Sequence, residues 1–190
     1  FAADVEPHEY EQLERLLTGD YATEERILLD VEVIKEDGSK HYLAVNDAVV
    51  ARGQLSKTID LHLSLDGDEI SKYRADGLLF ATPTGSTAYS LSAGGPILAP
   101  KMECILMTPV CPHSLFSRSV LFSGESELSV HVKIPEECCC VLTIDGEKNV
   151  PILATDRVVI RKSDLKLKLA LLHNRNFYKL LNEKLKERDF

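Results

Sequence analysis

Hydroxyl side chains are concentrated in residues 81–96, a stretch that directly follows a short apolar run. Six serine and threonine residues fall there, together with one early glycine and a closing Gly-Gly-Pro. Hydroxyl groups and exposed backbone N–H groups at a strand-to-helix turn are suited to bind a ribose, a phosphate or a carboxamide. A polar surface loop would have the same composition. The stretch therefore indicates either a binding loop for such groups or an ordinary solvent-facing turn.

The order of residues within this stretch predicts its local structure. Pro83 and Gly85 are typical of a tight turn. Ser86 or Thr87 is suited to cap a short helix through its side-chain oxygen. We expect that helix to end after Ser92, where two glycines and a proline follow.

Four polar residues outside the stretch could also bind a ligand. Asn46 offers a donor and an acceptor and Asp47 two acceptor oxygens, within a predicted strand at 41–52. Asp47 could equally be a charge that keeps a strand edge soluble. Arg74 could reach a phosphate or pair with a surface acid, and Asp76 is of a type common in turns.

Short strands dominate the predicted secondary structure. Alternating or β-branched runs, many separated by Asp-Gly turns, predict strands at 26–35, 41–52, 58–65, 69–74, 78–82, 105–110, 119–123, 128–134, 138–144, 157–162 and 165–171. Apolar stripes at helical spacing predict helices at 7–17 and 177–186. We therefore expect a mainly β fold: a two-sheet β-sandwich-like body of about ten or more short strands with a helix at each end.

Composition narrows the function classes. The 190 residues are 44% hydrophobic and carry a formal net charge of −8, which argues against a general nucleic-acid binder. We see neither an apolar run of the roughly 18 residues that a membrane span needs nor a signal peptide. The five cysteines contain no Cys-x-x-Cys pair, so we expect apolar packing in a reducing cytoplasm and no metal site.

The segment Thr82-Pro83-Thr84-Gly85-Ser86-Thr87-Ala88-Tyr89 resembles the substrate loop of NAD kinases, the enzymes that phosphorylate NAD to NADP. Three other segments are similar to that family in the same order. They are an Asn-Asp motif within 45–50, an Asp-Gly approach within 74–77, and a C-terminal helix within 176–185. The resemblance covers nearly the whole chain, and the eight-residue loop is its specific part.

The resemblance implies roles for individual residues. Asn46 would meet the adenine side of NAD, and Asp47 would bind ribose hydroxyls, although the family often has glutamate there. Thr87 would help fix the adenine, while Ala88 and Tyr89 would shape the pocket wall. The substrate residues it implies are Asn46, Asp47, Arg74, Asp76, Thr84, Ser86, Thr87, Ala88, Tyr89 and Ser92. Asp76 and Ser92 would address the nicotinamide carboxamide or its ribose.

The family's Gly-Gly-Asp-Gly-Thr motif, whose aspartate is the expected base, does not occur in the sequence. We therefore expect a truncated C-terminal portion that contains no catalytic residue and is inactive alone. Its predicted parts are a helical segment at 1–20, an all-β NAD-binding domain at 21–173 and a returning helix at 174–190. The intact enzyme would use ATP and Mg²⁺, neither bound by this chain alone.

The resemblance also implies partners: the N-terminal α/β domain that carries the missing motif, and further copies in a dimer or tetramer. A second copy would help to complete the nicotinamide pocket, and we expect the end helices to lack their natural packing partner. Two alternatives remain. One is the C-terminal domain of a related lipid kinase of the diacylglycerol or sphingosine type, and the other is a non-catalytic β oligomerisation module.

Overall fold

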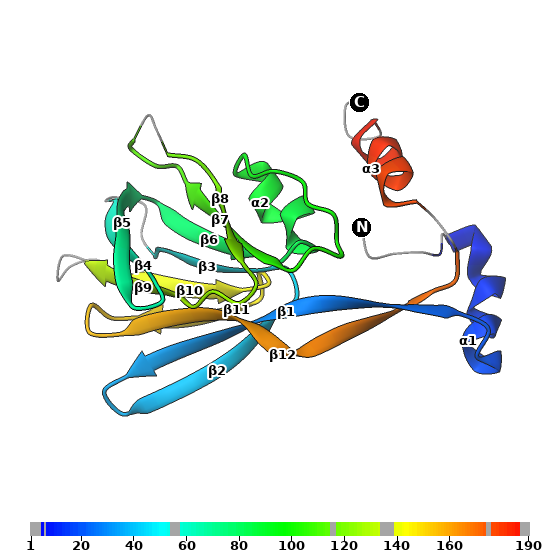
Figure 1. Ribbon diagram of the computed structural model, residues 1–190, viewed down its shortest axis with the longest axis horizontal. Helices are drawn as coiled ribbons and strands as arrows, with labels where there is room; N and C mark the ends of the chain where they lie inside the picture. Colours follow the sequence, from blue (N-terminus) through cyan, green and yellow to red (C-terminus); the bar gives the residue numbers. More distant parts are fainter. Residues whose placement is uncertain are drawn as a thin grey trace. The chain divides into compact units, whose positions relative to one another are not determined.

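Two six-stranded antiparallel sheets form the body of the protein (Figure 1). The computed structural model describes residues 5, 7–53, 58–114, 117–133, 139–173 and 176–186. The first sheet has the order β2 (Gly38–Ala44), β1 (Ala22–Lys35), β12 (Arg157–Leu171), β9 (Leu128–Lys133), β4 (Ile59–Leu65) and β5 (Asp68–Ala75). The second has the order β11 (Lys148–Ile152), β10 (Cys140–Ile144), β3 (Asp47–Arg52), β6 (Gly77–Ala81), β7 (Cys104–Val110) and β8 (Val120–Ser123). The mainly β, two-sheet prediction is confirmed.

The described helical segments are η1 (Pro7–Leu13), α1 (Glu14–Thr18), η2 (Gly85–Thr87), α2 (Tyr89–Ser92) and α3 (Phe177–Lys186). The chain divides into two compact units, one formed by Ile27–Lys166 and the other by residues up to Arg26 together with those from Leu167 onward. The predicted boundaries at residues 20 and 173 stay a prediction.

The main core of the larger unit lies between the two sheets. Leu29, Val31, Leu61 and Leu63 of the first sheet are buried in one cluster with Leu78 of the second. Because strand side chains alternate, these residues come from every second position of their strands. Their burial removes the largest block of apolar surface from water and fixes how the sheets face each other.

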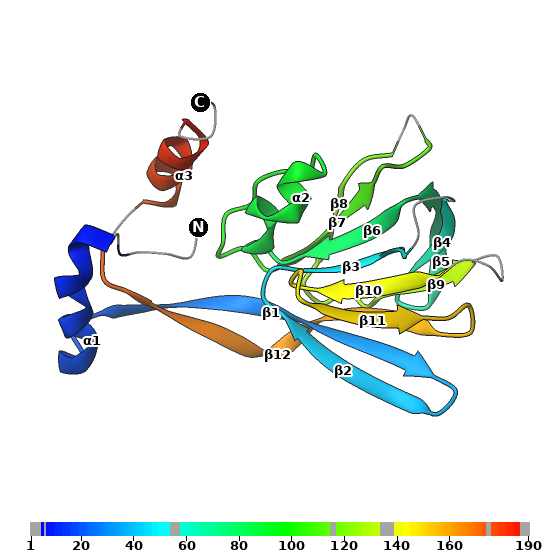
Figure 2. The same ribbon diagram turned by 180° about the vertical axis from the view of Figure 1, so that it is seen from behind.

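A second, smaller apolar cluster covers the other face of the second sheet. Leu79, Ala81 and Leu106 of that sheet pack there with Leu98, which follows α2. Figures 1 and 2 show α2 against this face from opposite sides, next to β6. Strand β6 is buried on both faces, which explains why its sequence is an unbroken apolar run.

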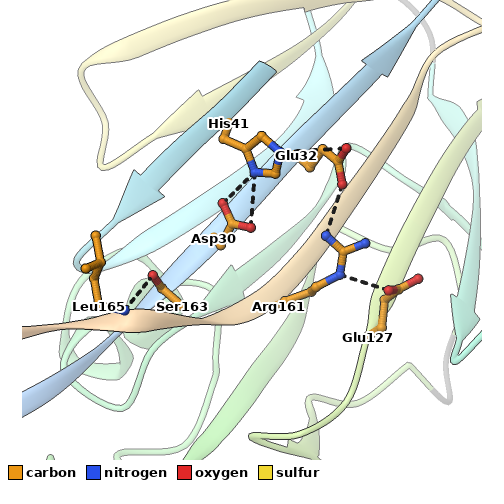
Figure 3. A network of polar contacts seen from close by, with 7 residues as sticks. All are labelled: Asp30, Glu32, His41, Glu127, Arg161, Ser163 and Leu165. Carbon is orange, nitrogen blue, oxygen red and sulfur yellow. Dashed lines mark hydrogen bonds and ion pairs between the residues drawn. The ribbon is translucent and has the colours of Figure 1, made fainter. Parts of the chain in front are cut away.

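The outer surface of the first sheet carries a connected set of charges (Figure 3). The Arg161 guanidinium of β12 donates to Glu32 of β1 at 3.0 Å and to Glu127 at 2.8 Å. The hydrogen bond from Arg161 is the largest of the effects that lower the pKa of Glu32. His41 of β2 lies 2.9 Å from Asp30. The charges therefore join neighbouring strands across the sheet.

The smaller unit contains η1, α1 and α3. Helix α1 ends at Gly19, whose φ of 74° is the left-handed conformation typical of a residue that ends a helix. The Arg15 guanidinium donates to the Leu172 carbonyl. The apolar stripe predicted along 7–17, which spans η1 and α1, is largely in contact with solvent, since Tyr10 and Leu17 are 66% and 89% exposed. The helix predicted at 177–186 is confirmed.

Several predicted elements were wrong. The strand predicted at 41–52 is two strands in different sheets, β2 and β3, because the backbone between them is bonded elsewhere. The strands predicted at 157–162 and 165–171 are one strand, β12. Strand β11 was not predicted, and the helix predicted at 7–17 begins as a 3₁₀ segment. None of the helices in the described ranges combines the length and apolar character needed to span a bilayer.

Candidate functional site

The chain crosses from the first sheet to the second at residues 45–47, and one carboxylate holds this crossover. Asp145 Oδ2 accepts a hydrogen bond from the Val45 N–H at 2.8 Å. Its Oδ1 accepts from the N–H groups of Asn46 at 2.7 Å and Asp47 at 3.0 Å. The Asp145 N–H donates to the Asp47 carbonyl at 2.9 Å. These bonds occupy the amides that a continuous strand would have placed in a ladder.

Thr82 holds the carbonyl side of the same crossover. Its hydroxyl donates to the Val45 carbonyl at 2.7 Å, and its N–H donates to the Asn46 carbonyl at 2.9 Å. The Thr82 hydroxyl also accepts from the Gly85 N–H at 3.0 Å. Every backbone N–H and C=O of residues 45–47 therefore has a partner, as buried peptide groups require.

Gly85 lies directly against the crossover. A Cβ atom at this position would come within 1.9 Å of the Asn46 carbonyl oxygen and 2.7 Å of its Cα. Only a glycine leaves room for this approach, which brings the hydroxyl-rich loop onto the Asn-Asp segment. Two parts of the sequence about 40 residues apart are joined in this way.

The helix predicted from Ser86 or Thr87 to Ser92 is broken at Ala88, whose φ and ψ are −94° and −128°. The predicted caps are also wrong, because the hydroxyls serve other bonds. Ser86 is fully buried; its hydroxyl donates to the Pro83 carbonyl at 2.6 Å and accepts from the Leu98 N–H at 3.0 Å. The Thr87 hydroxyl donates back to the Thr84 carbonyl at 3.3 Å. The break leaves Ala88 and Tyr89 exposed.

A pocket of about 440 Å³ lies where these segments meet, on the face of the second sheet that α2 borders. Val49 and Ala51 of β3 and Thr143 of β10 contribute apolar and hydroxyl surface from the sheet. Ala88 and Tyr89 contribute from the loop. The remaining lining residues are Asn46, Asp47, Asp145 and Gly146. An apolar sheet surface beside a few polar groups is typical of a site for a small ligand.

Asp47 is the unusual charge in this pocket. The residue is only 5% exposed, and burial, reinforced by the nearby Asp145 carboxylate, raises its pKa to about 6. Among the described residues, no hydrogen bond to the Asp47 carboxylate is present, whereas that of Asp145 accepts three. A buried carboxylate with unused acceptor capacity at a pocket wall can accept hydrogen bonds from a ligand.

The structure brings four of the ten predicted substrate residues into this pocket: Asn46, Asp47, Ala88 and Tyr89. Thr84, Ser86, Thr87 and Ser92 belong to the adjoining loop and do not line the pocket. Ser86 in particular joins two parts of that loop through its hydroxyl.

The other two predicted residues lie elsewhere. Arg74 pairs with Asp60 across β4 and β5, at 2.8 and 3.0 Å. Asp76 pairs with Arg52 at 2.9 Å. Because Ala51 pairs with Gly77 and Asp47 with Ala81, Asp76 stands at the opposite end of β3 and β6 from Asp47, about 13 Å away or more.

The sequence did not predict that Asp145 and Thr82 hold the crossover at residues 45–47. The Asp145-Gly146 pair in the sequence predicts a hairpin turn, with a contact at the edge of the site as the alternative; the two residues do form a turn, with φ values of 48° and 73°. Its carboxylate contacts residues about 100 positions away, so no local pattern indicates the contact. Thr82 was assigned to the loop without its link to Asn46.

Comparison with known proteins places these features in a family. Residues 45–172 match the family described as the ATP-NAD kinase C-terminal domain. A protein named NAD kinase from Natranaerobius thermophilus is 40% identical over 187 residues, covering 97% of this chain and 65% of that protein. An NAD kinase from Magnetococcus marinus is 40% identical over 179 residues, covering 93% of this chain and 58% of that protein. The chain spans about three fifths of the length of these relatives.

Solved structures agree in fold. The crystal structure of yeast NADH kinase complexed with NADH superimposes with a TM-score of 0.85 at 26% identity, covering 97% of this chain and 57% of that one. An NAD kinase from Archaeoglobus fulgidus, solved in complex with ATP, gives a TM-score of 0.78 at 26% identity, covering 95% of this chain and 67% of that one. These matches do not favour the lipid-kinase or oligomerisation-module alternatives. The chain belongs to the ATP-NAD kinase C-terminal domain family.

Proposed function

We propose that this chain is the NAD-binding part of an NAD kinase, which transfers a phosphoryl group from ATP or polyphosphate to the 2′-hydroxyl of the adenosine ribose of NAD. The observation that carries the proposal is the pocket in which the Asn-Asp motif and the Ala88–Tyr89 pair meet, inside the matched residues 45–172. Two similar structures, a yeast NADH kinase complexed with NADH and an Archaeoglobus fulgidus NAD kinase in complex with ATP, support it.

The pocket residues suit the parts of a dinucleotide. Asp47 has acceptor oxygens for ribose hydroxyls, and Asn46 can both donate to and accept from an adenine edge. Tyr89 offers an aromatic face, and Val49 and Ala51 an apolar surface, for the base to lie against. Phosphoryl transfer depends mainly on alignment of the acceptor hydroxyl and on neutralisation of charge. Residues that hold NAD in one position therefore contribute to the reaction.

Turnover needs more than these residues. The 190 residues contain no Gly-Gly-Asp-Gly-Thr motif, so the proposed base lies in a segment outside them. No cluster of three or more His, Cys, Asp or Glu side chains that could hold a metal ion lies in the described ranges. Mg²⁺ and ATP belong to the proposal for the longer protein, where ATP phosphates supply metal ligands. We expect the chain alone to bind NAD without converting it.

The proposal includes self-association and a cytoplasmic location. Arg74 and Asp76 lie away from the pocket of their own chain; in this proposal they contact a nucleotide that is bound by a second copy in a dimer or tetramer. An N-terminal α/β domain with the missing motif is the other proposed partner. The four described cysteines, Cys104, Cys111, Cys139 and Cys140, are free, which is typical of a reducing compartment.

Thermal unfolding with and without NAD tests the proposal. A ligand that binds only the folded chain raises the melting midpoint as its concentration exceeds Kd. We expect NAD to raise the midpoint of the wild-type chain, and Asn46→Ala to reduce that rise strongly. Thr143→Ser, which keeps the hydroxyl at the pocket wall, is the matched control and should retain it. A shift that is absent with NAD but present with a lipid substrate would contradict the proposal.

A further inference from the structure

We infer that Asp145 is a positioning residue of the nucleotide site: its carboxylate holds the crossover at residues 45–47 in the one arrangement that places Asn46 and Asp47 along the pocket. The identity of the ligand rests on the proposed function. The other part of the inference is that one side chain from a distant hairpin sets the geometry of the Asn-Asp motif, and this part is independent of the proposed function.

The hydrogen bonds of the crossover carry this inference. Three consecutive amides converge on the two oxygens of Asp145 at 2.7 to 3.0 Å. A carboxylate has about four lone-pair sites and can accept all three bonds, and charge strengthens each of them. An asparagine has one acceptor oxygen and an NH₂ group that would face an amide donor. The site therefore requires an anionic side chain, not merely a polar one.

The hairpin that carries Asp145 is itself rigidly placed. Strand β10 pairs with β3 from Cys140 to Ile144, which lies opposite Ala48. The Asp145 N–H continues this pairing by donating to the Asp47 carbonyl at 2.9 Å. The backbone thus brings the carboxylate to the first residues of β3. A change in the position of the carboxylate would therefore change the position of Asp47.

The same arrangement has an electrostatic consequence. The titratable groups that line the pocket are Asp47, Asp145 and Tyr89. The Asp145 charge adds to burial in raising the pKa of Asp47. Holding the amides and raising the proton affinity of Asp47 are therefore two effects of one side chain, and both can be measured.

The chain contains a matched control for a mutation at this position. Asp66 also begins an Asp-Gly hairpin with positive φ at both residues, 50° for Asp66 and 94° for Gly67. Its carboxylate accepts one hydrogen bond, from the Glu127 N–H at 2.9 Å, and it does not line the pocket. Asp66→Asn and Asp145→Asn therefore make the same chemical change in the same kind of turn.

The test compares the wild-type chain, Asp145→Asn and Asp66→Asn by NMR titration of Asp47 and by calorimetric titration with NAD. We expect Asp145→Asn to weaken NAD binding by about tenfold or more and to lower the titration midpoint of Asp47. Asp66→Asn should leave the NAD affinity within about twofold of wild type and the titration midpoint of Asp47 within a few tenths of a pH unit. The inference would be overturned if the Asp145→Asn chain folded, bound NAD with wild-type affinity and kept the wild-type titration midpoint of Asp47.

A second measurement, on the wild-type chain, covers the case in which Asp145→Asn does not fold. The amide protons of Val45, Asn46 and Asp47 should exchange slowly at neutral pH, because all three are hydrogen-bonded to Asp145. Fast exchange at all three would overturn the inference. Neither this measurement nor the Asp47 titration needs NAD, so failure of NAD to bind wild type would overturn the proposed function alone.

Discussion

Asp47 and Asp145 exchange two hydrogen bonds: Asp145 Oδ1 accepts from the Asp47 N–H at 3.0 Å, and the Asp145 N–H donates to the Asp47 carbonyl at 2.9 Å. Their carboxylates differ in what surrounds them. That of Asp145 is satisfied by three backbone amides, whereas that of Asp47 is buried at the pocket without a hydrogen bond among the residues the structure describes. The fold thus holds one carboxylate for structure and leaves the other available to a ligand.

Asp47→Asn should stabilise the chain at pH 7.5 by about 1 kcal/mol, or about 2–4 °C in melting midpoint. The pKa of Asp47 is raised from 3.8 to about 6 in the folded chain. The folded state therefore holds this proton more tightly than the unfolded state, and the stability that Asp47 contributes is lost as the pH rises through about 6. Melting scans from pH 4 to 8 should show the gain of the variant disappear below about pH 4.

Asp156→Asn is the control for that experiment. Asp156 is also buried, at 2% exposure, but it is paired with Lys35 at 2.6 Å. Removing a partnered buried charge leaves the other charge uncompensated, so this variant should be destabilised at pH 7.5. A destabilised Asp47→Asn at the same pH would contradict the account of Asp47 as an unpaired buried carboxylate.

Gly85→Ala should destabilise the chain by about 2–4 kcal/mol and abolish NAD binding, because its Cβ would collide with the Asn46 backbone. Chemical denaturation measures the first effect and calorimetric titration the second. Gly38→Ala is the control: its φ of 129° makes alanine strained, but a Cβ there meets nothing within 4 Å. It should cost about 1 kcal/mol and leave NAD binding intact. Equal effects of the two substitutions would be inconsistent with close packing at Gly85.

Ser86→Ala should lower the free energy of unfolding by about 1–3 kcal/mol, since it removes a hydrogen bond to the Pro83 carbonyl and leaves the Leu98 N–H without its acceptor. Ser92→Ala, at an exposed position of α2, should stay within about 0.5 kcal/mol of wild type. Denaturation curves of the two variants decide whether Ser86 acts through the fold of the loop. Similar curves would point instead to a role at the ligand.

Arg74→Ala should change stability by about 1 kcal/mol or less, because its ion pair with Asp60 is exposed. Its effect on NAD binding should depend on chain concentration: none where the chain is monomeric, and weaker binding where copies associate. Calorimetry on both sides of the association midpoint, located by sedimentation, measures this. Asp60→Ala breaks the same pair but keeps Arg74 and should not weaken binding. Weaker binding by monomeric Arg74→Ala would contradict a second-copy role.

The parts of the fold that sequence reasoning predicted are those with local signals. The alternation in β4 and the stripe of α3 gave elements close to those observed. The split at residues 45–47 could not be predicted, because Val45-Asn46-Asp47 continues a strand-like run and its amides leave the ladder only for the distant Asp145. The hydroxyls of Ser86 and Thr87 suggested helix caps, but both donate to a carbonyl three residues earlier in the loop, and Ser86 also accepts from the distant Leu98 N–H.

The same distinction holds for the site. The Asn-Asp pair and the Ala-Tyr pair were identified from their resemblance to a family, and they lie in one pocket. Arg74 and Asp76 were identified in the same way, but the pairing of β3 with β6 carries Asp76 to the far end of these strands. Strand register decides which residues of a motif share a pocket, and that register cannot be read from the sequence.

A crystal structure of the 190-residue chain grown with saturating NAD tests the central claim most directly. The account predicts the adenosine half of NAD in the pocket, with a ribose hydroxyl within hydrogen-bond distance of the Asp47 carboxylate, an adenine edge at Asn46, and Val49 and Tyr89 against the base. NAD bound at another surface with this pocket empty would contradict the account.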